Sequence, residues 1–249
     1  MVIENCIKKY SDSYFEDMFG VSNTKAAESY SRALRFLSDF ALDDDQYLQE
    51  CVPIMQSVFN PVKANEFDIH TSSFNILFQK GFNMSLQISS PMFTEETYCF
   101  IQIIFQACGD HYFYIVEDSA DNAAFQLKIP TTTSWKQLLS GGFISAVLFN
   151  MPYNNYRVFG DSGSWGKLCN YENSWSDYEI FGSKLDTPEI RNYNKQMALS
   201  VDDFLYLQNN IGFPPSIRIL SDVTIPDSKL TDDRYQANNK RKDLSLYVK

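Results

Sequence analysis

Few of the residues that build common metal and cofactor sites occur in this sequence. Its 249 residues include ten glycines, five cysteines and two histidines. No two cysteines form a CxxC pair, and no paired cysteines stand near either histidine, which argues against a zinc site of standard spacing. No GxGxxG fingerprint is present, and the stretch 163–167 (GSWGK) is too short for a phosphate-binding loop. We therefore expect neither a metal nor a cofactor.

A long hydrophobic run is also missing. The longest apolar stretches, 98–105 and 143–149, are too short to span a bilayer. Residues 1–10 contain three charged side chains and no apolar centre of the kind found in a signal peptide. The odd number of scattered cysteines predicts reduced thiols, as in a reducing compartment. We expect a cytoplasmic protein that does not enter membranes.

Basic residues are outnumbered by acidic ones. Lysine and arginine total 21 and aspartate and glutamate total 31, so the formal net charge is −10. This balance argues against broad binding of nucleic acid or of anionic lipid, and it fits either high solubility or a basic partner. Residues 1–70 contribute six of the excess negative charges, whereas the tail 227–249 has two more bases than acids. The distribution predicts a broadly negative globular surface.

Two helical segments are expected at the start of the chain. Apolar residues recur at spacings of three and four over 26–41, and Ser22 is one of the residues able to cap this helix. The same period continues over 48–59, where Pro53 predicts a kink or a break. Between the two segments, the triplet 43–45 (DDD) is typical of a solvated helix start, because carboxylates stabilise a helix N-terminus.

Strands joined by short turns are expected over the middle of the chain. Apolar and polar residues alternate over 82–88, which is typical of a half-buried strand. Six later strands are expected at these ranges: 98–108, 111–116, 125–129, 156–159, 165–171 and 178–181. Gly109-Asp110 is typical of a tight hairpin turn between the first two of these. Successive strands with short connections predict an antiparallel meander.

Helices are expected again between and after these strands. A short helix is predicted over 133–139, and 143–149 is a strand or a helix that periodicity cannot distinguish. Further helices are expected from Pro188, which suits a first helical turn, and from Ser200. The fold class is therefore α+β, with a mainly antiparallel sheet flanked by N-terminal and C-terminal helices.

The chain is expected to form one domain followed by a tail. The domain covers 1–226 and has a helical part (1–62), a part made mainly of strands (63–183) and a second helical part (184–226). Residues 227–249 are expected to be a polar tail, and the basic run 240–242 (KRK) within it is typical of a solvated segment.

A short motif resembles the active site of chymotrypsin-like serine proteases. Residues 160–163 read Gly-Asp-Ser-Gly, and His70, Asp110 and Ser162 occur in the matching order. The motif does not continue as Gly-Pro, and the sequence around His70 lacks the family's Ala-Ala-His-Cys context. We interpret 160–163 as a turn between strands and His111 as a turn or edge residue. We predict no catalytic residue, although either histidine could serve an enzyme without recognisable motifs.

Aromatic and acidic residues are concentrated in 153–181. Two of the three tryptophans lie there, in predicted hairpins beside carboxylates. Rigid aromatic side chains with fixed acids suit a surface that binds a basic protein. The candidate binding residues are Trp165, Tyr171, Glu172, Trp175, Asp177, Tyr178 and Glu179. Alternatively, Trp165 and Trp175 are core residues of a small sheet.

Two neighbouring stretches, 135–142 (WKQLLSGG) and 156–166 (YRVFGDSGSWG), resemble cytosolic immunity proteins of bacterial polymorphic-toxin systems. Those proteins are acidic α+β chains without catalytic motifs. The resemblance implies a non-enzymatic protein that neutralises a cognate toxin, here a basic one, by occluding it. Two alternatives stay open: a scaffold or oligomeric interaction protein, and an enzyme without recognisable motifs.

Overall fold

The computed structural model describes most of the chain between Ser22 and Met197. The described ranges are 22–61, 77–88, 92–118, 124–150, 155–170 and 178–197, with isolated positions at 4–5, 7–8, 11, 218–219 and 246–247. Every structural statement below refers to these residues.

The helix predicted over 26–41 is confirmed. Helix α2 spans Asn23–Phe40 and begins at Ser22, whose side chain accepts a hydrogen bond from the Lys25 amide (3.3 Å). Its apolar stripe buries Ala33, Phe36 and Leu37. Tyr30 and Leu34, which share the apolar spacing expected from the sequence, are each 41% exposed, so only part of the expected stripe faces the core.

A second helical segment follows and runs without a break through Pro53. Helix α3 (Asp44–Gln46) begins with a capping box between Asp43 and Gln46 and leads into a π-helical turn, η1 (Tyr47–Cys51). Helix α4 (Val52–Val58) then carries Pro53 in its first turn. Proline lacks an amide donor and its ring collides with the carbonyl four residues earlier, and the wider π-helical turn accommodates both effects.

Six antiparallel strands form the central sheet, in the order β1-β6-β5-β4-β2-β3. They are β1 (Asn83–Ile88), β2 (Tyr112–Glu117), β3 (Gln126–Pro130), β4 (Tyr156–Gly160), β5 (Trp165–Asn170) and β6 (Tyr178–Ser183). All six were predicted as strands from the sequence. The mainly antiparallel sheet and the α+β class are confirmed.

The strand predicted at 98–108 is wrong, because this segment is helix α5 (Glu95–Cys108). Thr94 and Thr97 form a capping box at its start, and Glu95 lies in its first turn, where a negative charge is favourable. Gly109 ends the helix in the left-handed conformation (φ 72°), so Gly109-Asp110 is a helix cap and not a hairpin turn. The strongly apolar composition of the segment hid its helical period.

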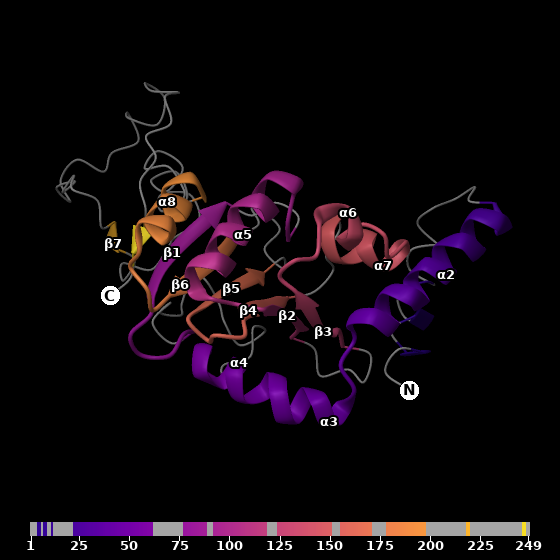
Figure 1. Ribbon diagram of the computed structural model, residues 1–249, viewed down its shortest axis with the longest axis horizontal. Coiled ribbons are helices and arrows are strands. Elements are labelled where there is room, and N and C mark those ends of the chain that lie inside the picture. The colour runs from indigo at the N-terminus through magenta and orange to yellow at the C-terminus, as the bar shows by residue number, and fades with distance from the viewer. Residues whose placement is uncertain are drawn as a thin grey trace, which may run out of the picture.

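Helices cover both faces of the sheet (Figure 1). One face packs against α5, α6 (Trp135–Leu138), α7 (Phe143–Ser145), the π-helical turn η4 (Ala146–Asn150) and α8 (Pro188–Met197). The opposite face packs against η1 and α4 through a second apolar cluster that includes Cys51, Val58 and Phe59. The sheet is therefore the middle layer of three, and this explains why both sides of β2 and β4 are buried.

The remaining expectations have mixed outcomes. The helices predicted at 133–139 and from Pro188 are confirmed as α6 and α8, and 143–149 is helical (α7 and η4). The helix expected from Ser200 lies outside the described residues, as does most of the tail. Leu246–Tyr247 (β8) pairs with Arg218–Ile219 (β7). No helix within the described ranges is both long enough and apolar enough to cross a bilayer.

Candidate functional site

Trp165 is a core residue, in agreement with the second interpretation of the tryptophans. Its side chain is completely buried on the α5 face of the sheet, and its ring stacks on Phe181 with 6.1 Å between centroids. The indole Nε1–H donates a hydrogen bond to Asp110 Oδ2 (2.6 Å). Trp165 therefore presents no surface to a protein partner.

Glu179 is buried on the same face of the sheet and forms an ion pair with Lys167. The Lys167 ammonium also donates to the Met92 carbonyl (3.1 Å) and lies 5.0 Å from the centre of the Phe93 ring. Burial opposes the charged ammonium, but the neighbouring Glu179 carboxylate more than offsets this, and the pKa of Lys167 is raised. Glu179 is thus a structural charge and not an exposed anchor.

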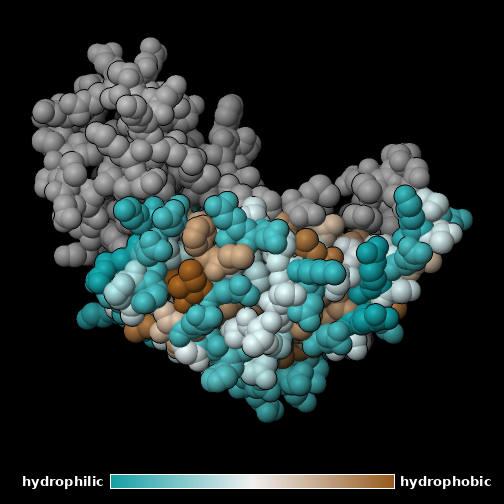
Figure 2. Space-filling view, turned by 45° about the horizontal axis from the view of Figure 1, so that its top comes forward, coloured by the Kyte–Doolittle hydropathy of each residue, from teal (hydrophilic) through white to brown (hydrophobic). Residues whose placement is uncertain are grey.

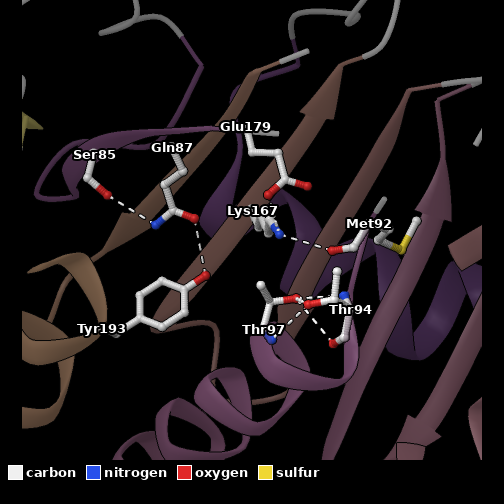
Figure 3. A network of polar contacts seen from close by, with 8 residues as sticks. All are labelled: Ser85, Gln87, Met92, Thr94, Thr97, Lys167, Glu179 and Tyr193. Carbon is white, nitrogen blue, oxygen red and sulfur yellow. Dashed lines mark hydrogen bonds and ion pairs between the residues drawn. The ribbon is translucent and has the colours of Figure 1, made fainter. Parts of the chain in front are cut away.

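Further polar side chains adjoin this pair between the sheet and α8 (Figure 3). Tyr193 of α8 donates to Gln87 Oε1 (3.2 Å), and the Gln87 amide reaches Ser85 (3.4 Å). Ser85 in turn donates to Asn194 Oδ1 (2.6 Å). All four side chains are buried, so these hydrogen bonds fix α8 on strand β1.

The other predicted binding residues are not brought together by the described structure. Tyr171, Glu172, Trp175 and Asp177 lie outside the described residues. Tyr178 opens strand β6 opposite Ile88, and its side chain is likewise outside the description.

The Gly-Asp-Ser-Gly segment (160–163) is a turn between β4 and β5, and this confirms the prediction of a turn between strands. Asp110 approaches Ser162 but accepts a hydrogen bond from its backbone amide (2.8 Å), whereas the Ser162 hydroxyl accepts from the Ser164 amide (3.3 Å). The exposed His111 donates its own backbone amide to Asp161 (3.0 Å). These contacts stabilise a turn, and they differ from a triad, in which the carboxylate orients a histidine. His70 lies outside the described residues.

An exposed acidic surface runs from the end of α2 along α3 and η1. Helix α3 lies on the opposite side of the sheet from α5 (Figure 1). Between Arg35 and Lys63 the chain has five acids and no lysine or arginine. All five acids are exposed, and we call them the acidic surface: Asp39, Asp43, Asp44, Asp45 and Glu50. Leu48, within the same stretch, is 61% exposed. Glu50 forms an ion pair with Lys128 of β3 (2.5 Å).

A cavity of about 230 Å³ adjoins the acidic surface at Tyr47. We call it the α4 cavity, and its lining comes from η1, α4 and the ends of β2 and β4: Tyr47, Met55, Gln56, Phe59, Asn60, Pro61, Val116, Glu117, Asp118 and Arg157. Arg157 donates to Asp118 Oδ2 from both Nε (3.3 Å) and Nη2 (2.8 Å). Burial raises the pKa of the Tyr47 hydroxyl.

No local sequence pattern points to the α4 cavity. Its residues come from three separate stretches, and only the pairing of β2 with β4 places Val116 beside Arg157. The acidic surface had a visible signal, since the triplet 43–45 was recognised as a helix start and Asp43 does cap α3. The exposure of the whole stretch was not anticipated.

The described residues contain no group of three or more metal-binding side chains. Comparisons with protein-family models, with curated proteins and with solved structures gave no match. The function proposed below therefore rests on the chain's own residues.

Proposed function

We propose that this chain is a non-enzymatic, immunity-type protein that binds and occludes a basic protein toxin in the cytoplasm. The observation that carries the proposal is the acidic surface, where five exposed acids occur without an intervening base. A surface of one charge sign accelerates encounter with an oppositely charged partner and disfavours partners of like charge. The likeness of 135–142 and 156–166 to immunity proteins supports the same function.

The acidic surface is held on a rigid support. Cys51, Val58 and Phe59 anchor η1 and α4 to the sheet, and each is at most 2% exposed. The capping box at Asp43 fixes the start of α3. A preformed surface loses little conformational entropy on binding, and this favours tight occlusion of a partner.

Exposed apolar side chains elsewhere are less suited to binding a protein. On the part of the α5 side visible in Figure 2, apolar residues appear as small patches separated by hydrophilic ones. Scattered exposed apolar residues are normal for a folded domain. The acidic surface combines four exposed aspartates with the most exposed large apolar residue among those described, Leu48, and Lys128 pairs with its fifth acid, Glu50.

The proposal is tested with two matched charge-neutralising variants. Asp44→Asn/Asp45→Asn removes two charges from the first turn of α3, and Glu95→Gln/Glu96→Gln removes two from the first turn of α5 on the other side of the sheet. Both variants change the net charge equally and lose a similar interaction with a helix N-terminus. Partners are captured from the organism that encodes the chain, identified, purified and measured by surface plasmon resonance.

We expect a basic protein that binds with 1:1 stoichiometry. Its association rate at about 0.05 M salt should fall about 3- to 10-fold for the α3 variant and stay unchanged for the α5 variant, with the difference shrinking at high salt. Failure to find a stoichiometric basic partner, or equal effects of the two variants, would overturn the proposal.

A further inference from the structure

Two aspartates connect the loop 109–111 after α5 to the turn 160–163 between β4 and β5. Asp110 lies in the loop, and its Oδ1 accepts a hydrogen bond from the Ser162 amide of the turn (2.8 Å). Asp161 lies in the turn, and its Oδ1 accepts from the His111 amide of the loop (3.0 Å). Each aspartate thus binds the amide next to the other aspartate, and this arrangement brings the two side chains together. We call Asp110 and Asp161 the aspartate pair.

The Asp110 carboxyl group is enclosed by the protein. The residue is 8% exposed, and its Oδ2 accepts from the Trp165 indole (2.6 Å). Gly160 passes so close that a Cβ at its position would overlap the carboxyl atoms of Asp110. A carboxyl group packed in this way has no room to move, so any rearrangement of the aspartate pair falls on the more exposed Asp161.

Among the described residues, no cation compensates the aspartate pair. None of the ion pairs that these residues form involves Asp110 or Asp161. The groups that adjoin the pair from α5, from β2, from the segment after β3 and from the start of β5 carry no positive charge: Cys108, Tyr114, Thr131, Ser162 and Trp165. Two carboxylates in contact repel each other, so the favourable state holds one proton between them.

The pKa of Asp110 is raised, in agreement with a retained proton. Burial is the largest cause, and hydrogen bonds from Trp165 and Ser162 oppose it. A side-chain hydrogen bond between Asp110 and Asp161 raises the pKa further. Such a bond exists only when one of the two carboxyl groups carries a proton, because a carboxylate has no hydrogen to donate.

We propose that Asp110 and Asp161 share one proton, which closes a pH-sensitive clasp between the loop after α5 and the β4–β5 turn. At low pH the shared proton joins the two carboxyl groups. As the pH rises the proton leaves to water, the carboxylates repel, and Asp161 turns outward and releases the His111 amide. This inference is independent of the proposed function, because it uses none of the residues of the acidic surface.

The first experiment follows the proton in the natural protein. The ¹³Cγ signals of the aspartate pair are assigned with Asp110→Asn and Asp161→Asn and recorded from pH 4 to 8. We expect the two signals to share a midpoint above the ordinary carboxyl range, since one proton serves both groups. Separate midpoints, or a common one within the ordinary range, would overturn the inference. Because the exposed His111 also changes charge near neutral pH, the titration is repeated in His111→Gln, where the shared midpoint should persist.

The second experiment measures the clasp by hydrogen exchange at the His111 amide, corrected for the intrinsic rate at each pH. Asp161→Asn keeps an oxygen for this amide and supplies an N–H to Asp110 at every pH. Asp39→Asn removes one charge at an exposed position of α2 and is the matched control. The amide of Ile115, in the centre of β2, is the internal reference.

The protection of the His111 amide is compared from about one pH unit below the shared midpoint to about two units above it. We expect it to fall at least about fivefold in the natural protein and in Asp39→Asn, and to stay constant in Asp161→Asn. Constant protection in the natural protein, or an equal fall in Asp161→Asn, would contradict the clasp. A parallel fall at Ile115 would also contradict it, because the whole sheet would then be loosening.

Discussion

Removing the Lys167 ammonium should destabilise the protein strongly. Lys167→Met keeps most of the aliphatic stem but leaves the Glu179 carboxylate, 2% exposed, without its ion-pair partner. Breaking a buried ion pair on one side costs about 3–5 kcal/mol, because an uncompensated charge stays in the interior. The variant also loses the hydrogen bond to the Met92 carbonyl and the contact with the Phe93 ring. We expect a loss in the free energy of unfolding near the upper end of that range.

A double-mutant cycle isolates the ion pair. Glu179→Gln alone leaves the ammonium buried and should cost a similar amount, whereas Lys167→Met/Glu179→Gln removes both charges. We expect the double variant to cost at least about 2 kcal/mol less than the sum of the two single variants. Lys136→Met, at an exposed position on α6, is the control and should change stability by less than about 0.5 kcal/mol.

Urea unfolding followed by circular dichroism at pH 7 measures all four variants. The natural domain is expected to have a stability of about 5–15 kcal/mol, so the single variants remain measurable at low denaturant. A cost below about 1 kcal/mol for Lys167→Met would refute the reasoning, as would exact additivity in the cycle. Either result would mean that the Lys167–Glu179 ion pair contributes little to stability.

Two further predictions concern a thiol and a carboxyl group. Burial raises the pKa of the Cys51 thiol to about 12, so in the native protein it should react with DTNB at least about 100-fold more slowly than the exposed Cys99 thiol. In urea the two thiols should react equally fast. Comparable rates in the native protein would contradict this prediction. Burial also raises the pKa of Asp110, despite opposing hydrogen bonds from Trp165 and Ser162, so the folded state holds this proton more tightly than the unfolded state. The free energy of unfolding of the natural protein, relative to that of Asp110→Asn, should therefore fall as the pH rises from the ordinary carboxyl range through the raised pKa. Urea titrations from pH 4 to 7 measure this difference. A difference that does not change with pH would contradict the prediction.

Local sequence patterns predicted most of the elements but not the type of each one. Local patterns were sufficient to predict α2 from its helical period, β1 from its alternation, and β4 and β5 from the turns around them. Each of these patterns is visible within a few residues. Helix α5 was predicted as a strand because residues 98–108 are apolar nearly throughout. The length of this apolar segment and the capping residue Thr94 indicate a helix more reliably than its composition does.

The candidate binding residues show where sequence reasoning stopped. Trp165 and Glu179 lie in an aromatic and acidic stretch that resembles a surface, yet both point into the core. Their side of the sheet follows from register, because pairing Lys167 with Phe181 and Cys169 with Glu179 directs all four side chains towards α5 and α8. A charged residue in a strand is expected to face water unless it has a partner of opposite charge. Here the partner of Glu179 is Lys167, which lies on the neighbouring strand β5.

By itself, the sequence determined the α+β class, the net negative charge and the capped start of α3, since composition and short-range spacing carry that information. Tertiary structure alone decided which face of the sheet each strand residue occupies, that Lys167 and Glu179 neutralise each other in the interior, and that segments around Tyr47, Val116 and Arg157 enclose a cavity. These features depend on contacts between residues far apart in the chain. Such contacts arise only when the strands pair and both helical layers close over the sheet.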